Sequence, residues 1–256
     1  MDLQERGNLT EEQRQRYQRN ILLAGVGPEG QEKLLRSSVL LVGTGGLGSP
    51  AAFYLAAAGV GRIGLIDGDT VSLSNLQRQI LHTTADLGRA KVISAGEKLK
   101  ALNPELRLET YQEVFNESVA EGLIKKYDFV IDCTDNFPSR FIINRACVRL
   151  KKPFVYGGVL AWAGQTFTVM PGEGPCFECI FREAPSADAP TTSEVGVLGA
   201  VPGVIGTIQA AEAIRFILGI GELLVGRILT YDALSASFYE VTVSRDGNCP
   251  ACGQRG

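Results

Sequence analysis

The chain has 256 residues, of which 45% are hydrophobic, and a formal net charge of -3. This length accommodates one large α/β domain or two small ones with a buried core. The charge is mild, and no run of Lys or Arg is longer than a pair. Nucleic acid is therefore not expected as the main partner.

No targeting or membrane-spanning segment is expected. Residues 1–6 are polar and lack the apolar stretch of a signal peptide. The longest apolar run, 195–208, is interrupted by Pro202 and several glycines, and it is shorter than the ~20 residues that cross a bilayer. We expect a soluble, cytoplasmic protein with no membrane partner.

The predicted elements begin with two helices. Residues 11–24 carry charges on one face and Tyr17, Ile21 and Leu22 on another, which predicts an amphipathic helix. Residues 31–36 are predicted as a second helical segment.

A βαβ unit follows. The apolar run 38–42 leads directly into a glycine-rich turn, as a buried parallel strand does. An alanine-rich helix over 49–58 ends at Gly59, a natural C-terminal stop. Residues 62–67 are predicted as the next strand.

Strands and helices continue to alternate along the chain. Further strands are predicted at 106–111, 129–133, 154–156, 165–170, 228–231 and 238–243. Further helices are predicted at 89–102, 116–125, 138–150 and 202–218. The pattern predicts a single α/β domain over residues 1–256, with a Rossmann-like, doubly wound and largely parallel sheet that continues into antiparallel strands.

Residues 181–195 interrupt this pattern. They contain Pro185 and Pro190 among Ala, Ser and Thr, which predicts a mobile crossover loop on the surface. The sequence is compatible both with a plain linker and with a lid over a site.

The glycine turn predicts a nucleotide site. Gly43, Gly45, Gly46 and Gly48 form a G-x-G-x-x-G pattern between a strand and a helix, where a phosphate can approach backbone N–H groups and the helix N-terminus. Asp67 ends the next strand about 20 residues further on, where an acid binds ribose hydroxyls. The pattern alone does not separate NAD from ATP.

Residues beyond the second strand favour a triphosphate. Ser74, Asn75, Gln77 and Arg78, followed by Lys91, supply amides and two cations that exceed what a dinucleotide requires. Such groups suit β- and γ-phosphates, whose charge needs neutralising as pyrophosphate leaves. We therefore predict ATP as the nucleotide.

A carboxylate follows another strand at the same edge of the sheet. Asp135 and Asn136 come directly after the strand 129–133, and open α/β sheets bind ligands at the carboxyl ends of their strands. Mg²⁺ in nucleotide sites is held by one or two carboxylates and phosphate oxygens. Asp135 is therefore predicted to bind Mg²⁺.

Two C-x-x-C pairs predict a structural zinc site. Cys176, Cys179, Cys249 and Cys252 would supply four thiolates and leave no open position. A redox role for one pair is the alternative. The other cysteines, 133 and 147, are predicted to be buried apolar residues.

His82 is the only histidine. A site that needs two histidines is therefore excluded, and a Ser-His-Asp triad is disfavoured. We expect His82 to be a hydrogen-bonded structural residue.

The chain resembles the MoeB/ThiF family, bacterial relatives of ubiquitin-activating enzymes. Several segments carry the resemblance along nearly the whole chain: residues 16–23, 43–48, 74–79 and 132–136 and both cysteine pairs. The resemblance implies ATP-dependent adenylylation of the C-terminal Gly-Gly carboxylate of a small ubiquitin-like sulfur-carrier protein. It also implies a homodimer, with the N-terminal helices of residues 1–36 at its interface.

The resemblance also implies roles for individual residues. Gly46 and neighbouring amides would contact phosphate and Asp67 the ribose, while Asn75, Arg78 and Lys91 would hold the triphosphate. Arg19 would reach the triphosphate of the opposite subunit, which completes a catalytic set with Arg78, Lys91 and Asp135.

One position departs from the family. Some relatives carry a cysteine in the crossover loop that bonds covalently to the carrier or its sulfur, and here that place holds Thr192. A hydroxyl is almost never ionised at neutral pH. The chain is therefore expected to stop at the acyl-adenylate and to leave sulfur delivery to a separate donor protein.

Two other functions remain compatible with the sequence. An NAD(P)-dependent oxidoreductase would explain the glycine turn and Asp67 but not Arg78 or its neighbouring amides. A non-catalytic scaffold that binds the carrier would not need Arg78, Lys91 and Asp135. The sequence does not distinguish molybdopterin, thiamine, tRNA thiolation or another sulfur pathway.

Overall fold

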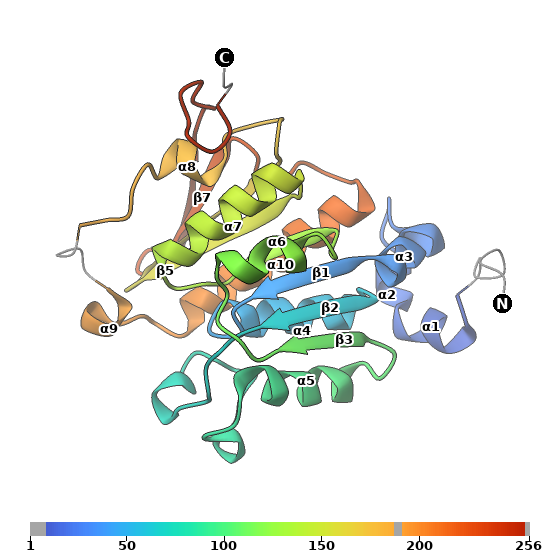
Figure 1. Ribbon diagram of the computed structural model, residues 1–256. Helices are drawn as coiled ribbons and strands as arrows, with labels where there is room; N and C mark the ends of the chain where they lie inside the picture. Colours follow the sequence, from blue (N-terminus) through green and yellow to red (C-terminus); the bar gives the residue numbers. More distant parts are fainter. Residues whose placement is uncertain (1–8, 187–190, 254–256) are drawn as a thin grey trace.

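The computed structural model describes residues 9–186 and 191–253, and these form an eight-stranded sheet in the order β3-β2-β1-β4-β5-β6-β7-β8 (Figure 1). The strands are β1 Ser38–Val42, β2 Arg62–Ile66, β3 Arg107–Tyr111, β4 Phe129–Asp132, β5 Phe154–Leu160, β6 Ala163–Val169, β7 Arg227–Asp232 and β8 Ser237–Thr242. Strands β1 to β5 pair in parallel, and β5 to β8 pair antiparallel. The predicted parallel sheet with an antiparallel extension is confirmed.

Helices cover both faces of the sheet (Figure 1). The longer ones are α3 Gly27–Arg36, α4 Gly48–Ala58, α5 Lys91–Leu102, α6 Glu117–Ile124, α7 Phe137–Leu150 and α10 Ala200–Leu218. One buried cluster joins α4, α5 and α10 to one face of the sheet. A second cluster joins α6 and α7 to the opposite face. The molecule is therefore doubly wound, as predicted.

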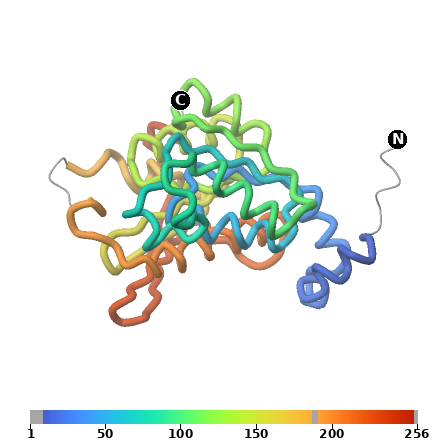
Figure 2. Tube along the Cα trace, turned by 90° about the horizontal axis from the view of Figure 1, so that it is seen from below, coloured from blue at the N-terminus to red at the C-terminus, as the bar shows by residue number. Residues whose placement is uncertain are grey.

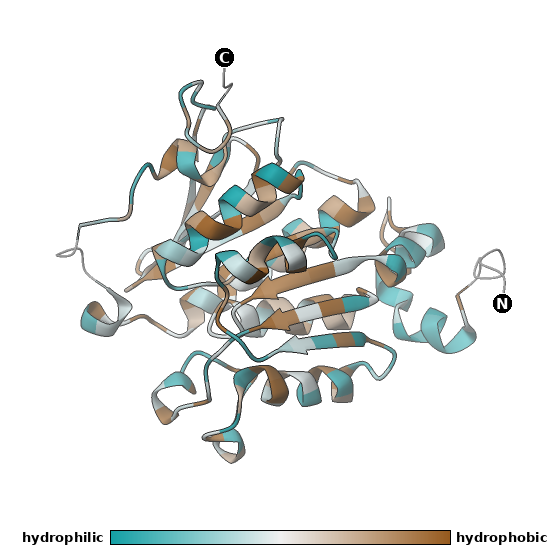
Figure 3. Ribbon diagram, viewed as in Figure 1, coloured by the Kyte–Doolittle hydropathy of each residue, from teal (hydrophilic) through white to brown (hydrophobic). Residues whose placement is uncertain are grey.

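The central strands are apolar because both of their faces are covered. Every residue of β1 and β4 is buried, whereas every residue of the edge strand β8 is exposed. Figure 3 shows the contrast between the hydrophobic centre of the sheet and the hydrophilic α1. Strand order reverses between β1 and β4, which places a ligand-binding edge at their carboxyl ends.

The N-terminal segment differs from its prediction. The single helix expected over 11–24 is wrong, because two short helices, α1 Glu11–Arg16 and α2 Gln18–Ile21, are separated at Tyr17. Tyr17 is buried, and its hydroxyl accepts a hydrogen bond from Asn103 Nδ2 at 2.9 Å. Anchoring this ring in the core turns the chain between the two helices.

α10 is the one helix of the described residues that is long and apolar enough to span a membrane, and half of it is buried inside the molecule. It packs on α4, β5 and β6. Gln209 and Glu212 on this helix are fully buried and hydrogen-bonded. Its apolar composition thus reflects a place in the core.

Two short helices lie beside or within the described parts of the predicted crossover loop. A short helix, α8 Phe177–Ile180, precedes it, and α9 Thr192–Val195 forms its end. The backbone then pairs at Val197 with Ala161, next to β5. Residues 187–190 of the predicted loop 181–195 lie outside the described part of the chain, as do residues 1–8 of the predicted dimer segment 1–36.

Candidate active site

The carboxyl ends of β1, β2 and β4 surround a pocket of about 240 Å³. Its walls are formed by the glycine turn, the segments after β2, β3 and β4, the start of α5, Val159 of β5 and the C-terminal end of the crossover segment with the residues that follow it. Of the predicted residues, the following line it: Gly43, Gly45, Gly46, Asp67, Arg78, Lys91, Asp135 and Asn136. The structure therefore brings eight of the predicted residues together at one pocket.

Glycine is required at two positions of the turn. Gly43 has a φ of +96°, and a Cβ there would lie 2.8 Å from the Cys133 carbonyl oxygen. A Cβ on Gly48 would lie 2.2 Å from the Gly43 carbonyl oxygen. The turn can close only without these side chains, which brings the N-terminus of α4 to the pocket, where its N–H groups favour an anion.

Asp67 braces the turn as well as lining the pocket. Its Oδ2 accepts hydrogen bonds from the backbone N–H of Thr44 at 2.8 Å and from the Thr44 hydroxyl at 3.0 Å. Its Oδ1 accepts from the N–H of Asp69 at 2.9 Å. The predicted ribose acid is thus held in a fixed orientation at the end of β2.

His82 supports the same turn from behind. Its Nε2 lies 3.1 Å from the Thr44 carbonyl oxygen, which can only accept, so Nε2 is the donor. Nδ1 then accepts from the Ser94 hydroxyl at 2.9 Å. Burial, together with the charges of Lys91 and Lys98, lowers the pKa of His82 although the Thr44 contact opposes the shift. The expected structural role of His82 is confirmed.

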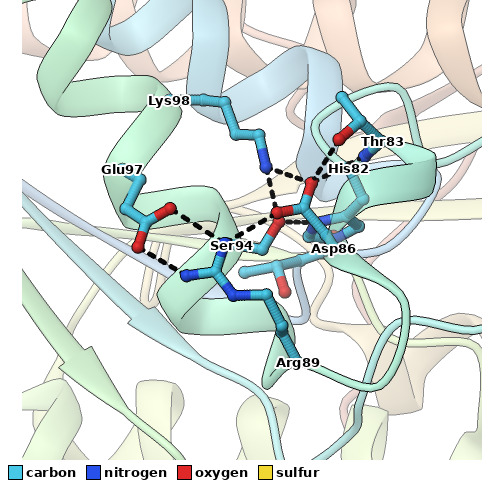
Figure 4. Close-up of polar contacts among 8 residues, drawn as sticks. His82, Thr83, Asp86, Arg89, Ser94, Glu97 and Lys98 are labelled. Carbon is cyan, nitrogen blue, oxygen red and sulfur yellow. Dashed lines mark hydrogen bonds and ion pairs between the residues drawn. The ribbon is translucent and has the colours of Figure 1, made fainter.

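A charged cluster continues from Ser94 to the surface (Figure 4). Lys98 Nζ donates to Ser94 Oγ at 2.9 Å and also to the buried carboxylate of Asp86. Asp86 accepts further bonds from the N–H and hydroxyl of Thr83, both at 2.8 Å, and from Arg89 at 2.9 Å. The cluster connects the glycine turn to α5 and the short helix Thr84–Asp86.

Both predicted cations line the pocket. Lys91 begins α5, is buried, and its Nζ donates to Asp69 Oδ2 at 2.8 Å. Arg78 donates to the Ser74 carbonyl at 3.1 Å and is partly exposed. Gln79 lies between them in the chain, is buried, and its Oε1 has no hydrogen-bond partner among the described residues. The pocket thus presents cations and unused polar capacity to an anionic ligand.

The segment after β4 supplies the predicted Mg²⁺ ligand. Asp135 is exposed in the pocket wall, and Asn136 caps α7 by accepting the N–H of Ser139 at 3.0 Å. The preceding Asp132 is fully buried and binds Thr134 through Oδ1. Asp67 and Asp69 also line the pocket, but both accept hydrogen bonds from neighbouring groups. Asp135 is an accessible carboxylate beside the glycine turn and fits a hydrated Mg²⁺, which uses few protein ligands.

A larger groove of about 650 Å³ adjoins the pocket. It runs between the start of α7, β5, β6 and the crossover segment. Five residues line both spaces: Asp135, Asn136, Arg140, Val159 and Thr192. The two cavities are therefore neighbours with a common wall.

Some predicted residues lie away from the pocket lining. Ser74 and Asn75 end the short helix Leu73–Asn75, and Gln77 packs against the backbone at Gly199. Arg19 is exposed on α2, and the N-terminal helices lie at the opposite end of the molecule from α9 in both views (Figures 1 and 2). Gly48 is also absent from the lining, and contact of all the predicted residues with nucleotide stays a prediction.

Four cysteines gather at the predicted metal clamp. All four sulfur atoms lie within 4.8 Å of one another. The Cys176–Cys249, Cys179–Cys252 and Cys176–Cys179 sulfur distances are 3.5, 3.4 and 3.9 Å. A tetrahedron of thiolates with Zn–S bonds of 2.3 Å has edges of about 3.8 Å, so the cluster has the size of a zinc site.

The chemistry of the clamp also calls for a cation. Burial, reinforced by neighbouring thiols, raises the pKa of Cys179 to about 12. Burial would also raise the pKa of Cys249, but backbone N–H groups of Cys252 and Ala251 outweigh burial and lower it. Zinc binding requires all four thiolates, whose charges a cation would balance. Two N–H groups already point at sulfur: Asn144 Nδ2 lies 3.6 Å from Cys176 Sγ, and the Asp246 N–H lies 3.5 Å from Cys179 Sγ. Such bonds orient thiolate ligands.

The remaining cysteines behave as predicted. Cys133 and Cys147 are buried outside the clamp, and burial raises the pKa of both thiols. They are apolar core residues.

The sequence analysis assigned no individual role to Gln79, Asp69 or Arg140, which all line the pocket. Gln79 stood within the polar segment that suggested a triphosphate. Arg140 had a positional signal, because it follows the helix cap Asn136 by four residues and so lies one turn into α7, near the same edge. Asp69 had no signal apart from following Asp67.

Comparison with known proteins agrees with this architecture. The family model described as "ThiF family" matches residues 17–251. The chain is 47% identical over 250 residues to a sulfur carrier protein adenylyltransferase of Thermus thermophilus, covering 95% of this chain and 92% of that protein. It is 43% identical to the SAMP-activating enzyme E1 of Haloferax volcanii, covering 94% and 89%.

Other relatives are longer or more distant. The chain is 45% identical to adenylyltransferase and sulfurtransferase MOCS3-1 of Zea mays but spans only 53% of that protein. The crystal structure of MccB from E. coli superposes with a TM-score of 0.85 over 97% of this chain and 76% of that chain, at 24% identity, which shows a shared fold. The chain therefore belongs to the ThiF family of ATP-dependent adenylyltransferases.

Proposed function

We propose that this protein adenylylates the C-terminal carboxylate of a small ubiquitin-like sulfur-carrier protein that ends in Gly-Gly. The reaction uses ATP and releases pyrophosphate, leaving an acyl-adenylate ready for thiocarboxylate formation. The names of the Thermus thermophilus and Haloferax volcanii relatives support this substrate class. The pathway served, whether molybdopterin, thiamine or another sulfur-transfer route, follows from whichever carriers the chain accepts.

The observation that carries the proposal is the common wall of the two cavities. The pocket has a phosphate cradle and the cations Arg78 and Lys91. The adjoining groove is lined largely by apolar and small residues, including Gly158 and Gly164 on neighbouring strands. A narrow peptide tail in the groove would place its terminal carboxylate at the phosphates, which aligns the two reactants.

The residues present suit this chemistry. A terminal carboxylate with a pKa near 3.5 is ionised at neutral pH, so no general base is needed. His82, the only histidine, is buried behind the glycine turn and engaged with Thr44 and Ser94. The protein's task is to align the carboxylate with the α-phosphate and to stabilise charge on pyrophosphate, for which Arg78 and Lys91 are suited.

Asp135 would hold Mg²⁺ beside the phosphates. The ion would neutralise charge on the nucleotide oxygens. Asp135 contributes the carboxylate, and its place after β4 fixes that carboxylate at the junction with the groove.

The proposal includes a homodimer. Arg19 does not line the nucleotide pocket, and the N-terminal helices lie at the opposite end of the molecule from α9 (Figures 1 and 2), which favours a role for Arg19 at the pocket of another copy. Leu22 and Leu23 beside it are exposed at 69% and 59%, and burial of such side chains favours association. In this arrangement Arg19 would add positive charge to the partner's triphosphate.

The proposal ends the reaction at the acyl-adenylate. Thr192 lines both cavities, at the place where some relatives carry a cysteine. Its hydroxyl is not a thiolate equivalent. A separate, cytoplasmic sulfur donor would therefore complete thiocarboxylate formation.

Carrier-dependent ATP–pyrophosphate exchange tests the proposal. Purified Gly-Gly-ending carriers are incubated with the protein, Mg²⁺ and ATP, and the adenylate is identified by mass spectrometry. Asp135→Ala is expected to lower exchange at least about 100-fold, the scale of losing a group that organises the transition state. Glu173→Ala, an exposed carboxylate in the turn after β6, is the matched control. Full exchange by Asp135→Ala would remove Asp135 from the mechanism, and no exchange with any carrier would contradict the proposed function.

A further inference from the structure

Arg140 lies where the nucleotide pocket meets the groove. It stands in the first turns of α7, lines both cavities and is only 7% exposed. One terminal nitrogen donates to the Thr134 carbonyl at 3.1 Å. This bond fixes the guanidinium against the end of β4.

The guanidinium has no acidic side chain in direct contact. In the described parts of the chain no ion pair includes Arg140, and its buried Nε has no hydrogen-bond partner. The charge of the buried Asp132 acts on Arg140 only at longer range, and Oδ1 of Asp132 accepts from Thr134. A buried guanidinium with an unused donor is costly, and an anion that binds it directly recovers part of that cost. The environment therefore favours a negatively charged ligand at Arg140.

Two aromatic rings beside Arg140 indicate that the ligand reaches it through the groove. The guanidinium carbon lies 4.9 Å from the ring centre of Phe137 and 5.1 Å from that of Tyr156. Such contacts hold the guanidinium in place and limit its hydration. Both rings line the groove but do not line the nucleotide pocket. Arg140 is thus set into the wall of the groove.

The distribution of charge identifies the anion. The nucleotide pocket has Arg78 and Lys91 for phosphates, whereas Arg140 is the only Lys or Arg among the described residues that line the groove. An anion that arrives through the groove meets this one cation, at the boundary with the phosphates. The groove would carry a peptide tail, whose single fixed negative charge is its terminal carboxylate.

We propose that Arg140 binds the terminal carboxylate of the carrier tail and orients it toward the α-phosphorus of ATP. This inference rests on the function proposed above. Guanidinium and carboxylate are both planar, so paired N–H donors fix the plane of the carboxylate. One carboxylate oxygen then forms the bond to the α-phosphorus, and the bond from that phosphorus to the bridging oxygen breaks. Pyrophosphate leaves with the electron pair of the broken bond, and no proton is transferred.

A double-mutant cycle tests the pairing. One partner is the protein, as wild type or Arg140→Gln. The other is a carrier that supports exchange, used either with its native terminal carboxylate or with that carboxylate converted to a carboxamide. Carrier affinity is measured by calorimetry without nucleotide. The wild-type protein is expected to bind the carboxamide carrier at least about 30-fold more weakly than the carboxylate carrier, which is the scale of breaking a buried charge pair. Against Arg140→Gln, the same change is expected to cost less than about twofold, because the coupling is gone.

Kinetics and nucleotide binding separate this role from others. Arg140→Gln should raise the KM for carrier or lower kcat while the affinity for a non-hydrolysable ATP analogue stays within about twofold of wild type. Arg140→Lys keeps the positive charge but lacks the paired N–H donors of the guanidinium. It should recover part of the activity that Arg140→Gln loses. Arg149→Gln, an exposed arginine further along α7, is the matched control and should behave as wild type.

Three results would overturn the inference. If the carboxamide lowers carrier affinity equally for wild type and for Arg140→Gln, Arg140 does not contact the carboxylate. An equal fall in affinity for the ATP analogue without carrier would assign Arg140 to phosphate instead. If Arg140→Gln does not fold, the wild-type comparison of the two carriers still decides, because unchanged affinity for the carboxamide excludes a cation at the tail's end. Absence of exchange by the wild type with every carrier would instead contradict the proposed function itself.

Discussion

Replacement of Asp86 by Asn should destabilise the protein, because this carboxylate organises the cluster behind the glycine turn (Figure 4). The Asp86 side chain is 3% exposed and accepts from Thr83, Arg89 and Lys98. Burial alone would raise its pKa, but hydrogen bonds from Lys98 and Thr83 outweigh burial and hold the pKa well below its usual value. Asn keeps the size and one acceptor but loses the charge.

The expected cost follows from these contacts. A hydrogen bond to a charged group contributes about 1.5–3 kcal/mol. Lys98 is 25% exposed, so it regains part of its hydration when the charge is removed. We therefore expect a loss of about 2 kcal/mol in the free energy of unfolding. For a chain of this size that corresponds to a fall in Tm of about 4–8 °C.

Thermal unfolding at fixed zinc concentration measures this effect. Glu97→Gln is the matched control, because Glu97 pairs with Arg89 in the same cluster but is 58% exposed; its Tm should change by less than about 2 °C. Since the folded pKa of Asp86 is depressed, its stabilisation is complete above the unfolded pKa near 4 and fades as pH falls through the folded pKa. The Tm difference should thus be constant from about pH 5 to 8. A change for Asp86→Asn no larger than for Glu97→Gln would refute this reasoning.

Three further predictions concern the turn, the clamp and the histidine. Gly48→Ala should lower the affinity for an ATP analogue at least about 10-fold, because the added Cβ would lie 2.2 Å from the Gly43 carbonyl oxygen. Gly203→Ala, whose Cβ would have open space around it, should bind the analogue normally in the same titration. Cys249→Ser should lower the zinc content and the Tm, and equal zinc in Cys249→Ser and in the core variant Cys147→Ser would contradict the assigned ligand set. Because the pKa of His82 is depressed in the folded state, wild-type stability should fall as pH drops below about 6.5, the pKa of the unfolded state. His82→Gln should flatten the Tm profile in that pH range. An unchanged slope would show that another group is responsible.

Local sequence patterns were sufficient to predict the sheet. All eight strands occur where apolar or alternating runs predicted them, because a central strand must be apolar on both faces. The break at Tyr17 was missed because it depends on Asn103, more than eighty residues away, which no local pattern reveals. The error over residues 11–24 therefore arose from a contact between residues distant in the sequence.

The candidate site shows the same division. Glycines 43 to 48 and Asp135 could be located because their types and their places at strand ends carry the signal. Arg140 could not be assigned, because its importance comes from what surrounds it: two aromatic rings and a donor without a hydrogen-bond partner. Such an environment exists only after β5 and α7 have packed together.

The course of α7 has a consequence for how this enzyme depends on metal supply. The helix is 14 residues long, which is about 21 Å, and it starts at the cap Asn136 beside Asp135. In its middle, Asn144 donates to Cys176 Sγ and, with Arg145, binds the carboxylate of Glu178. The same helix therefore touches the four-cysteine cluster and begins at the nucleotide pocket. Removal of a metal from the cluster should thus lower the affinity for an ATP analogue as well as the Tm.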